Sequence, residues 1–174
     1  METIGWKDYR EAMGRLGAAV NIVTTDGPAG RHGLTASAVC SVTDTPPTLL
    51  VCVNRRAGAH DVLTKNGVLC VNVLARHHRD LSNRFGRPGT SVTERFNGAD
   101  WQTMKTGAPV LVDAAVNFDC RITQTQEMGT HSVLFCQVVA VSIADVPEGL
   151  IYFNRDYHDL APRPPALHSL SSGG

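Results

Sequence analysis

Hydrophobic and polar residues alternate along several short stretches of the chain, which is the pattern of β-strands. In residues 114–122 every second position is apolar, a period of two that predicts a strand with one buried face. Residues 132–143 are apolar on both faces, as expected of a strand that lies under a helix or a subunit interface. Further strands are predicted at residues 18–25, 48–54, 68–74 and 150–154, with a pair of strands rich in small residues at 33–43.

Three other segments show helical spacing. Trp6, Tyr9, Met13 and Leu16 recur at steps of three and four, so they form one stripe along a helix. Shorter helices are predicted at residues 60–66, where Gly67 follows, and at residues 76–85.

Many β segments joined by short turns, with few helices between them, favour a mainly β chain with flanking helices. The connections suit an antiparallel barrel better than a doubly wound parallel sheet. Residues 1–160 are expected to form one domain. The tail at residues 161–174 is rich in Pro, Ser and Gly and is expected to be disordered.

The 174 residues include 16 basic and 16 acidic side chains, so the formal net charge is zero. This balance argues against a nucleic-acid-binding or membrane-surface protein, which normally carries a basic patch. The longest apolar runs, such as residues 48–53, are too short to span a bilayer. Because the N-terminal residues lack an apolar core, no signal peptide is expected and the predicted location is the cytoplasm.

Five cysteines lie inside apolar, strand-like runs and form no Cys-x-x-Cys pair, so we expect buried, inert thiols in a reducing compartment. The adjacent residues His77 and His78 lack the spacing that directs two imidazoles at one ion, and no metal site is predicted.

Three glycines, Gly27, Gly30 and Gly33, have the spacing GxxGxxG rather than the GxGxxG of a dinucleotide-binding fold. The turn sequence Asp26-Gly27-Pro28 and the β-like residues around it predict a hairpin. A phosphate loop of the GxxxxGK type is also absent from the sequence, so a nicotinamide cofactor would have to bind by other means.

Most of residues 33–42 are small or carry hydroxyl groups. Such a run lets a flat ligand approach the backbone, whose N–H groups can then bond acceptor atoms at a ring edge. A tightly packed corner of a barrel would need small residues equally, and composition alone leaves both interpretations open.

Five motifs in order carry a family resemblance over most of the chain: GLTASAVCSVTDTPPTLLVCVN, LCVNVL, the pair Arg84-Phe85, the GTH of residues 129–131, and LIYFNRDYH. Together they resemble the flavin reductase component of two-component flavin monooxygenases. The likeness is strongest to the reductase of 4-hydroxyphenylacetate 3-monooxygenase, and the flavin reductase of uracil degradation is similar.

The resemblance implies a homodimeric, FMN-binding split β-barrel. In such proteins the isoalloxazine ring lies along the strand that corresponds here to Thr35, Ala36, Ser37, Ala38, Cys40 and Ser41. The ribityl phosphate end is held by the segment of Asn54, Arg55, Ala57, Gly58 and Ala59, and the pocket is completed by Asn72, Val73, Leu74, Arg84 and Phe85. Relatives often carry hydroxyl or amide side chains in the phosphate segment, so here backbone N–H groups with Arg55 or Arg56 are expected to serve.

By the same resemblance His131 contacts the nicotinamide, and Tyr152 and Tyr157 lie near the cofactor pocket. The implied reaction passes hydride from NADH, or NADPH, to FMN or FAD, and the reduced flavin then serves a separate oxygenase component. The cofactors supply the bond chemistry, so no residue is assigned to proton transfer.

Three other functions fit the same sequence. The chain could be a non-catalytic split barrel that binds flavin or haem, an oxidase of the pyridoxamine-phosphate type, or a structural dimeric barrel. The oxidase would need a basic phosphate cluster for its substrate, which the sequence does not reveal.

Overall fold

The computed structural model describes residues 3–146 and 148–162, so most of the tail predicted to be disordered lies outside the described residues. The elements in chain order are α1 (Trp6–Gly14), β1 (Ala18–Ala19), β2 (Asn21–Thr25), β3 (His32–Ala36), β4 (Val39–Asp44), β5 (Pro47–Asn54), α2 (His60–Asn66), β6 (Val68–Val73), the 3-10 turn η1 (Arg76–His78), α3 (Arg79–Gly86), α4 (Val92–Phe96), β7 (Trp101–Thr103), β8 (Pro109–Leu111), β9 (Val116–Met128), β10 (His131–Ile143), β11 (Gly149–Phe153) and β12 (Asp156–Leu160).

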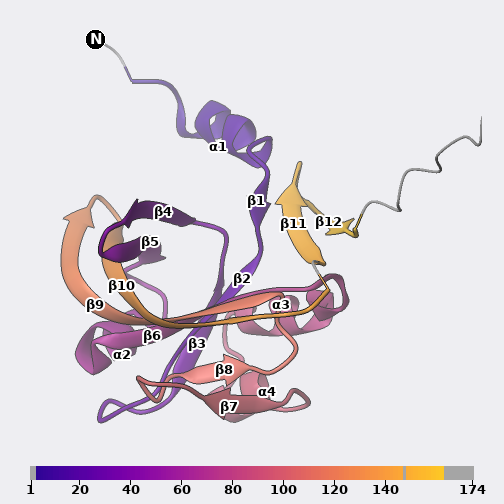
Figure 1. Cartoon of the computed structure of the whole chain (residues 1–174). Helices are drawn as coiled ribbons and strands as arrows, with labels where there is room; N and C mark the ends of the chain where they lie inside the picture. Colours follow the sequence, from indigo (N-terminus) through magenta and orange to yellow (C-terminus); the bar gives the residue numbers. More distant parts are fainter. Residues whose placement is uncertain (1–2, 147, 163–174) are drawn as a thin grey trace, which may run out of the picture.

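Seven strands form one antiparallel sheet in the order β3-β2-β6-β9-β10-β5-β4. The long strands β9 and β10 curl round the molecule (Figure 1), and their pairing shifts register between Phe135 and Cys136 and again between Val138 and Ala140. Such irregularities add bend and twist to a strand pair. The prediction of an antiparallel rather than a doubly wound arrangement is therefore confirmed.

The main core gathers buried side chains from α2 and from six strands of this sheet, β2, β3, β5, β6, β9 and β10. Along β5, Leu49, Val51 and Val53 are buried while their neighbours are more exposed, the alternation expected of a strand with one face inward. A second core packs α3 and α4 over β2 and β8, with the rings of Phe85 and Phe96 5.1 Å apart in an edge-to-face contact.

The hairpin between β2 and β3 reaches toward α2. Gly30 has a φ of +92°, which favours glycine, and its N–H donates to the carbonyl of Gly27 over 2.9 Å. The amide of Asn66 fixes this hairpin to α2 by donating to the carbonyl of Gly30 and accepting from the N–H of Ala29, both at 2.9 Å. The glycine-rich segment is thus the hairpin turn that its sequence predicts.

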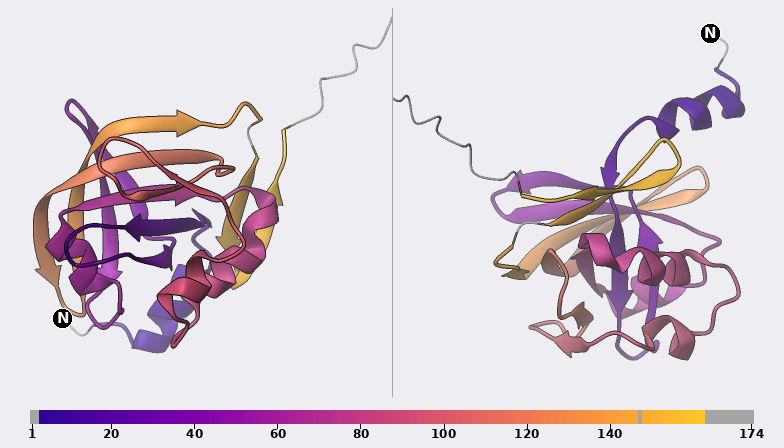
Figure 2. Two further views of the ribbon diagram at one scale, coloured as in Figure 1. Left: turned by 90° about the horizontal axis from the view of Figure 1, so that it is seen from below. Right: turned by 90° about the vertical axis from the view of Figure 1, so that its right-hand side faces the viewer.

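Helix α1 projects away from the sheet in Figure 1 and in the right-hand view of Figure 2, and it has no buried residue. Its predicted stripe of Trp6, Tyr9, Met13 and Leu16 is exposed along its whole length. Nowhere in the part of the chain that the structure describes is a helix long and apolar enough to cross a membrane.

The five cysteines are all free thiols. Cys70, Cys120 and Cys136 are buried as predicted, and Cys52 is partly buried. Cys40 is exposed, which corrects the expectation of burial, because it lies on the edge strand β4.

Candidate functional site

A cavity of about 600 Å³ lies between the β2–β3 hairpin, the segment joining β5 to α2, and the C-terminal end of α3. Its walls are formed by residues 32–38, 52–54, 56–59 and 85–90, together with Arg95 and His131. The size is typical of sites that hold a small molecule. The fold thus brings together segments that lie as far apart in the sequence as residues 32 and 131.

One wall of the cavity is the edge of the sheet. Strand β3 pairs only with β2, and the residues that follow it, Ser37 and Ala38, are exposed. An edge strand leaves backbone N–H and C=O groups unpaired on its outer side. Since residues 35–38 carry small side chains, a flat ligand can approach these groups closely.

The wall carries five basic side chains: Arg56, Arg87, Arg95, His32 and His131. No Asp or Glu belongs to the lining among the described residues. Charges of one sign gathered in a cleft raise the local potential and attract a ligand of the opposite charge. The cavity is therefore suited to an anion.

Arg95 shapes the wall after α3. Its side chain is buried and donates to the carbonyls of Phe85, of Arg87 over 2.9 Å and of Thr90 over 3.2 Å. Burial lowers the pKa of Arg95, because a buried guanidinium loses hydration, and the nearby Glu94 opposes this effect. Arg95 thus holds the 85–90 loop in place and adds its charge to the cavity.

The segment between β5 and α2 forms the opposite wall. The side-chain oxygen of Asn54 accepts a 2.9 Å bond from the N–H of Arg56, and its backbone carbonyl accepts from Ala57 over 2.9 Å. A β-carbon built on Gly58 would lie 3.4 Å from Nε2 of His32, so this wall comes close to the start of β3. Because the N–H groups of Arg55, Arg56 and Ala57 already have acceptors, this wall offers an anion the side chain of Arg56 more than a row of free amides.

His131 closes the cavity beside this segment. It is the first residue of β10 and the strand partner of Asn54, and it is exposed. Its Nδ1 lies 2.9 Å from Oγ1 of Thr130. The imidazole is accordingly held at the rim, where it can contact a second ligand.

The structure brings together one part of the predicted site. The predicted residues that line the cavity are Thr35, Ala36, Ser37, Ala38, Asn54, Ala57, Gly58, Ala59, Phe85 and His131. Arg56, which the sequence offered only as an alternative to Arg55, also lines it. The basic residues His32, Arg87 and Arg95 were not predicted. For Arg87 the Pro-Gly pair that follows a helix is a loop signal, whereas nothing local distinguishes Arg95.

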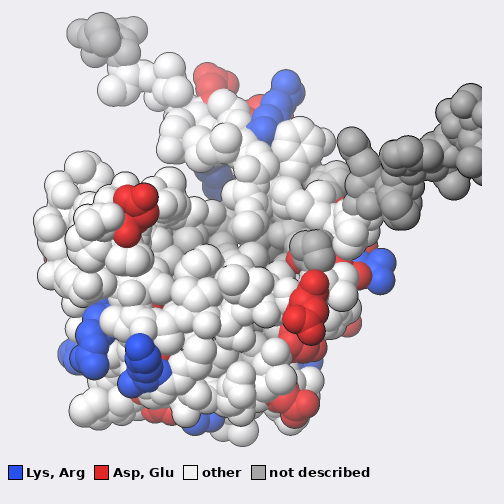
Figure 3. Space-filling model, in the orientation of Figure 1, with Lys and Arg blue, Asp and Glu red and all other residues white. Residues whose placement is uncertain are grey.

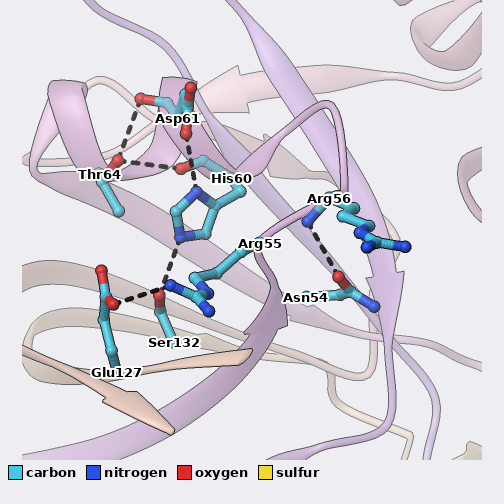
Figure 4. Close-up of polar contacts among 8 residues, drawn as sticks. All are labelled: Asn54, Arg55, Arg56, His60, Asp61, Thr64, Glu127 and Ser132. Atoms are coloured by element: carbon cyan, nitrogen blue, oxygen red, sulfur yellow. Dashed lines mark hydrogen bonds and ion pairs between the residues drawn. The ribbon is translucent and has the colours of Figure 1, made fainter. Parts of the chain in front are cut away.

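Arg55 turns the other way from Arg56 (Figure 4). Its guanidinium pairs with Glu127 over 2.8 Å and donates to the carbonyl of Gly129 over 2.6 Å. Arg84 likewise does not line the cavity, since its guanidinium donates to the carbonyl of Asn97. Both side chains are occupied in binding backbone or surface groups.

Asn72, Val73 and Leu74 lie away from the cavity in β6 and the residue after it. The amide of Asn72 is fully buried, donates to the carbonyl of Ile22 and accepts from the N–H of Leu111 over 2.7 Å. The polar atoms of Asn72 therefore have hydrogen-bond partners within the core, as buried amides generally do. The residue stabilises the fold.

Neither of the two predicted tyrosines lines this cavity. The hydroxyl of Tyr157 is 2.9 Å from that of Ser82 and donates to the side chain of Asn83 over 3.0 Å. Tyr152 contacts Tyr157 edge to face, with ring centroids 5.4 Å apart. Cys40 and Ser41, the predicted residues on β4, lie outside the cavity as well.

A second cavity of about 820 Å³ lies between α1 and the sheet and includes Cys40 and Tyr152. It shares Ser37, Ala38 and Cys52 with the first, so the two cavities adjoin. Figure 3 shows few charged side chains on the surface beneath α1.

The predicted absence of a metal site can be tested at His77, His78 and Asp113, whose ligand atoms lie within 4.8 Å of one another. Nδ1 of His78 accepts a 3.1 Å bond from the N–H of Ala75, so the neutral ring carries its proton on Nε2, which faces the carboxylate. A metal would have to displace that proton and break the bond to Ala75. The donor set therefore favours a histidine–carboxylate contact over a metal site.

Comparison with known proteins gives a consistent result. Residues 13–161 match the family described as "Flavin reductase like domain". The chain is 59% identical over 157 residues to a Variovorax paradoxus protein named FMN reductase (NADH) RutF, covering 90% of this chain and 87% of that one.

Two solved structures are similar. The NADH:FAD oxidoreductase SgcE6 of Streptomyces globisporus, in complex with NAD and FAD fragments, has a TM-score of 0.83 at 28% identity over 93% of this chain and 98% of that one. BorF, the flavin reductase component of a bacterial two-component tryptophan halogenase, has a TM-score of 0.83 at 25% identity over 91% and 100% of the respective chains.

Proposed function

Because this chain belongs to the flavin reductase-like domain family, we propose that it is an NADH-dependent flavin reductase with FMN as its preferred acceptor. The similar sequence named FMN reductase (NADH) supports NADH as the donor and FMN as the acceptor. FAD and NADPH are the alternative acceptor and donor.

The observation that carries the proposal is the basic cavity beside a strand edge of small residues. A flavin mononucleotide is a flat ring with acceptor atoms along one edge and a phosphate dianion at the other end. Residues 35–38 suit the ring, while Arg56, Arg87 and the buried charge of Arg95 suit the phosphate. The residues present therefore fit the group.

In this assignment Arg56 and Arg87 hold the phosphate with residues 57–59, and Phe85 contacts the ring system. His131, at the rim, contacts the nicotinamide of NADH. The assignment extends the predicted site by the two arginines and leaves Arg55, Arg84, Tyr152 and Tyr157 to supporting positions.

The bound cofactors supply the hydride donor and acceptor. The protein's contribution is placement, since the small residues of β3 and the imidazole of His131 bring two flat rings together. The cationic side chains stabilise negative charge in the cavity. No described residue is required to transfer a proton.

We also propose a split β-barrel fold that forms a homodimer. The exposed stripe of α1 and the adjoining cavity of about 820 Å³ are large apolar features for a single copy to expose, which supports burial against a second copy. The second cavity shares part of its wall with the first, so such a dimer would also support the flavin site.

Release of reduced flavin to a separate oxygenase component is the proposed cellular role. The similarity to a reductase component of a two-component halogenase supports it. A single domain at residues 1–160 is supported by the family match, and a cytoplasmic location by the five free thiols.

A steady-state assay that crosses NADH and NADPH with FMN, FAD and riboflavin tests the function. We expect turnover that is fastest with NADH and FMN, and riboflavin, which lacks the phosphate, should need a higher concentration. Flavin binding without NADH consumption would instead indicate the non-catalytic alternative, a flavin- or haem-binding protein.

A further inference from the structure

Three side chains behind the cavity form a continuous hydrogen-bonded chain (Figure 4). Nδ1 of His60 lies 2.8 Å from Oδ1 of Asp61, and Nε2 of His60 lies 2.9 Å from Oγ of Ser132. The carboxylate of Asp61 can only accept, so Nδ1 carries the proton and Nε2 accepts from the hydroxyl of Ser132. The His60 bond also keeps the pKa of Asp61 below its ordinary value.

The order Asp-His-Ser resembles that of a nucleophilic triad, but burial excludes this role. Ser132 is only 1% exposed, and it lines neither of the two large cavities. No substrate can reach its oxygen. The chain must therefore act through the elements that it joins.

One end of the chain is rigid. Ser132 lies in β10 between two neighbours, paired with Val53 of β5 and with Glu127 of β9. A central strand of this kind is held by hydrogen bonds on both sides.

The other end is not held by a sheet. His60 begins α2 directly after residues 55–59, which belong to no strand or helix and which include the cavity residues Arg56, Ala57, Gly58 and Ala59. Arg55 makes the matching contact at the beginning of this segment, where its N–H donates to the carbonyl of Thr130 over 3.0 Å. The segment is thus fastened to the β9–β10 hairpin at both of its ends.

We propose that His60 is a positioning residue, which holds residues 56–59 against the flavin phosphate by its hydrogen bond to the buried hydroxyl of Ser132. This inference rests on the proposed function and specifies how this chain fixes its phosphate segment. Asp61 contributes by keeping Nε2 of His60 free to accept.

Two pairs of variants test the bond. Ser132→Ala removes the hydroxyl and Ser132→Thr retains it. His60→Asn retains the position of Nδ1 but cannot reach Ser132, whereas the terminal amide of His60→Gln takes the position of Nε2. Each variant is first checked by circular dichroism, and the His60 pair serves if Ser132→Ala does not fold.

The readout is the dissociation constant of FMN and of riboflavin, measured by quenching of flavin fluorescence. We expect Ser132→Ala and His60→Asn to weaken FMN binding roughly five- to tenfold, the effect of one lost hydrogen bond, and to leave riboflavin binding unchanged. His60→Gln and Ser132→Thr should bind FMN like the parent protein.

Equal weakening of FMN and riboflavin would show a general loosening and overturn the proposal, as would unchanged FMN binding in both loss variants. A parent protein that binds FMN but does not oxidise NADH would contradict the proposed reductase function and leave this positioning role standing.

Discussion

The ring of Phe85 lies directly against the α-carbon of Gly33. A β-carbon at position 33 would come within 2.7 Å of Cε1 of Phe85 and 3.0 Å of the carbonyl oxygen of Val23. Both residues line the basic cavity, so the close approach of β3 and α3 defines its shape. Only glycine allows this approach.

We therefore expect Gly33→Ala to lower the free energy of unfolding by about 1–3 kcal/mol, as overpacking in a core generally does. It should also weaken flavin binding, because the ring of Phe85 must move. Gly17→Ala is the control, since its nearest neighbours are at 3.7 Å, an ordinary contact. Urea unfolding of the two variants checks the prediction, which fails if both are equally stable.

Arg87 and Arg56 should recognise the phosphate and not the ring. Replacing either by Gln is expected to raise the KM for FMN roughly five- to tenfold, the range of one charge-assisted hydrogen bond at a partly exposed site. The KM for riboflavin should not change. Steady-state kinetics with both acceptors provides the measurement.

Lys105→Gln removes the same charge at an exposed position outside the cavity and is the matched control. If it raised the KM for FMN as much as Arg87→Gln, the effect would come from net charge alone.

The pH dependence of stability should contain a contribution from His78. Burial lowers the pKa of this imidazole, and the opposing influence of the Asp113 carboxylate does not restore it. The unfolded chain, with an ordinary histidine pKa of about 6.5, therefore binds a proton more readily than the folded chain. Stability is expected to fall as the pH drops through about 6.5 and to level off below the folded pKa.

His78→Asn keeps an acceptor for the N–H of Ala75 and cannot titrate. Thermal unfolding from neutral to mildly acidic pH should show a smaller loss for this variant than for the parent protein. If the parent protein and His78→Asn lost the same stability as the pH drops, another group would cause the pH dependence.

A charge placed on the exposed stripe of α1 should weaken the proposed homodimer. Leu16 is 63% exposed and lines the second cavity, so Leu16→Lys should cost a monomer almost nothing. In a homodimer closed at this face it buries a charge and should shift the mass measured by light scattering toward the monomer. Ile4→Lys, equally exposed but outside that cavity, is the control.

The sequence predicted the longer elements because their periodicity extends over enough residues. Strands β5, β6, β9 and β10 all appear where the pattern placed them, and β9 and β10 extend further at one end. The short elements α4, β7, β8 and β12 were not predicted. Three to five residues provide too little periodicity to be recognised, and their formation depends on tertiary contacts.

The cavity is lined by residues from several of the predicted segments but by only some of the predicted side chains. Arg84 and Phe85 are adjacent in a helix, where successive residues point about 100° apart, so both could not face one cavity. Arg55 and Arg56 diverge similarly. Asn72 shows a further limit, because a buried amide in a strand can satisfy the core or a ligand, and only the neighbouring strands decide between them.

His131 provides the test of the nicotinamide position. It is exposed at the cavity rim, and its backbone is fixed by pairing with Asn54 and Met128. His131→Ala therefore removes a side chain at the rim and leaves the side chains of Arg56 and Arg87 in place. We expect the KM for NADH to rise roughly fivefold or more, the effect of a lost hydrogen bond or ring contact, while the dissociation constant of FMN stays nearly constant. His158→Ala, exposed and outside the cavity, should change neither constant. Unchanged NADH kinetics in His131→Ala would remove this residue from the site, whereas a matched loss of FMN affinity would place it with the flavin instead.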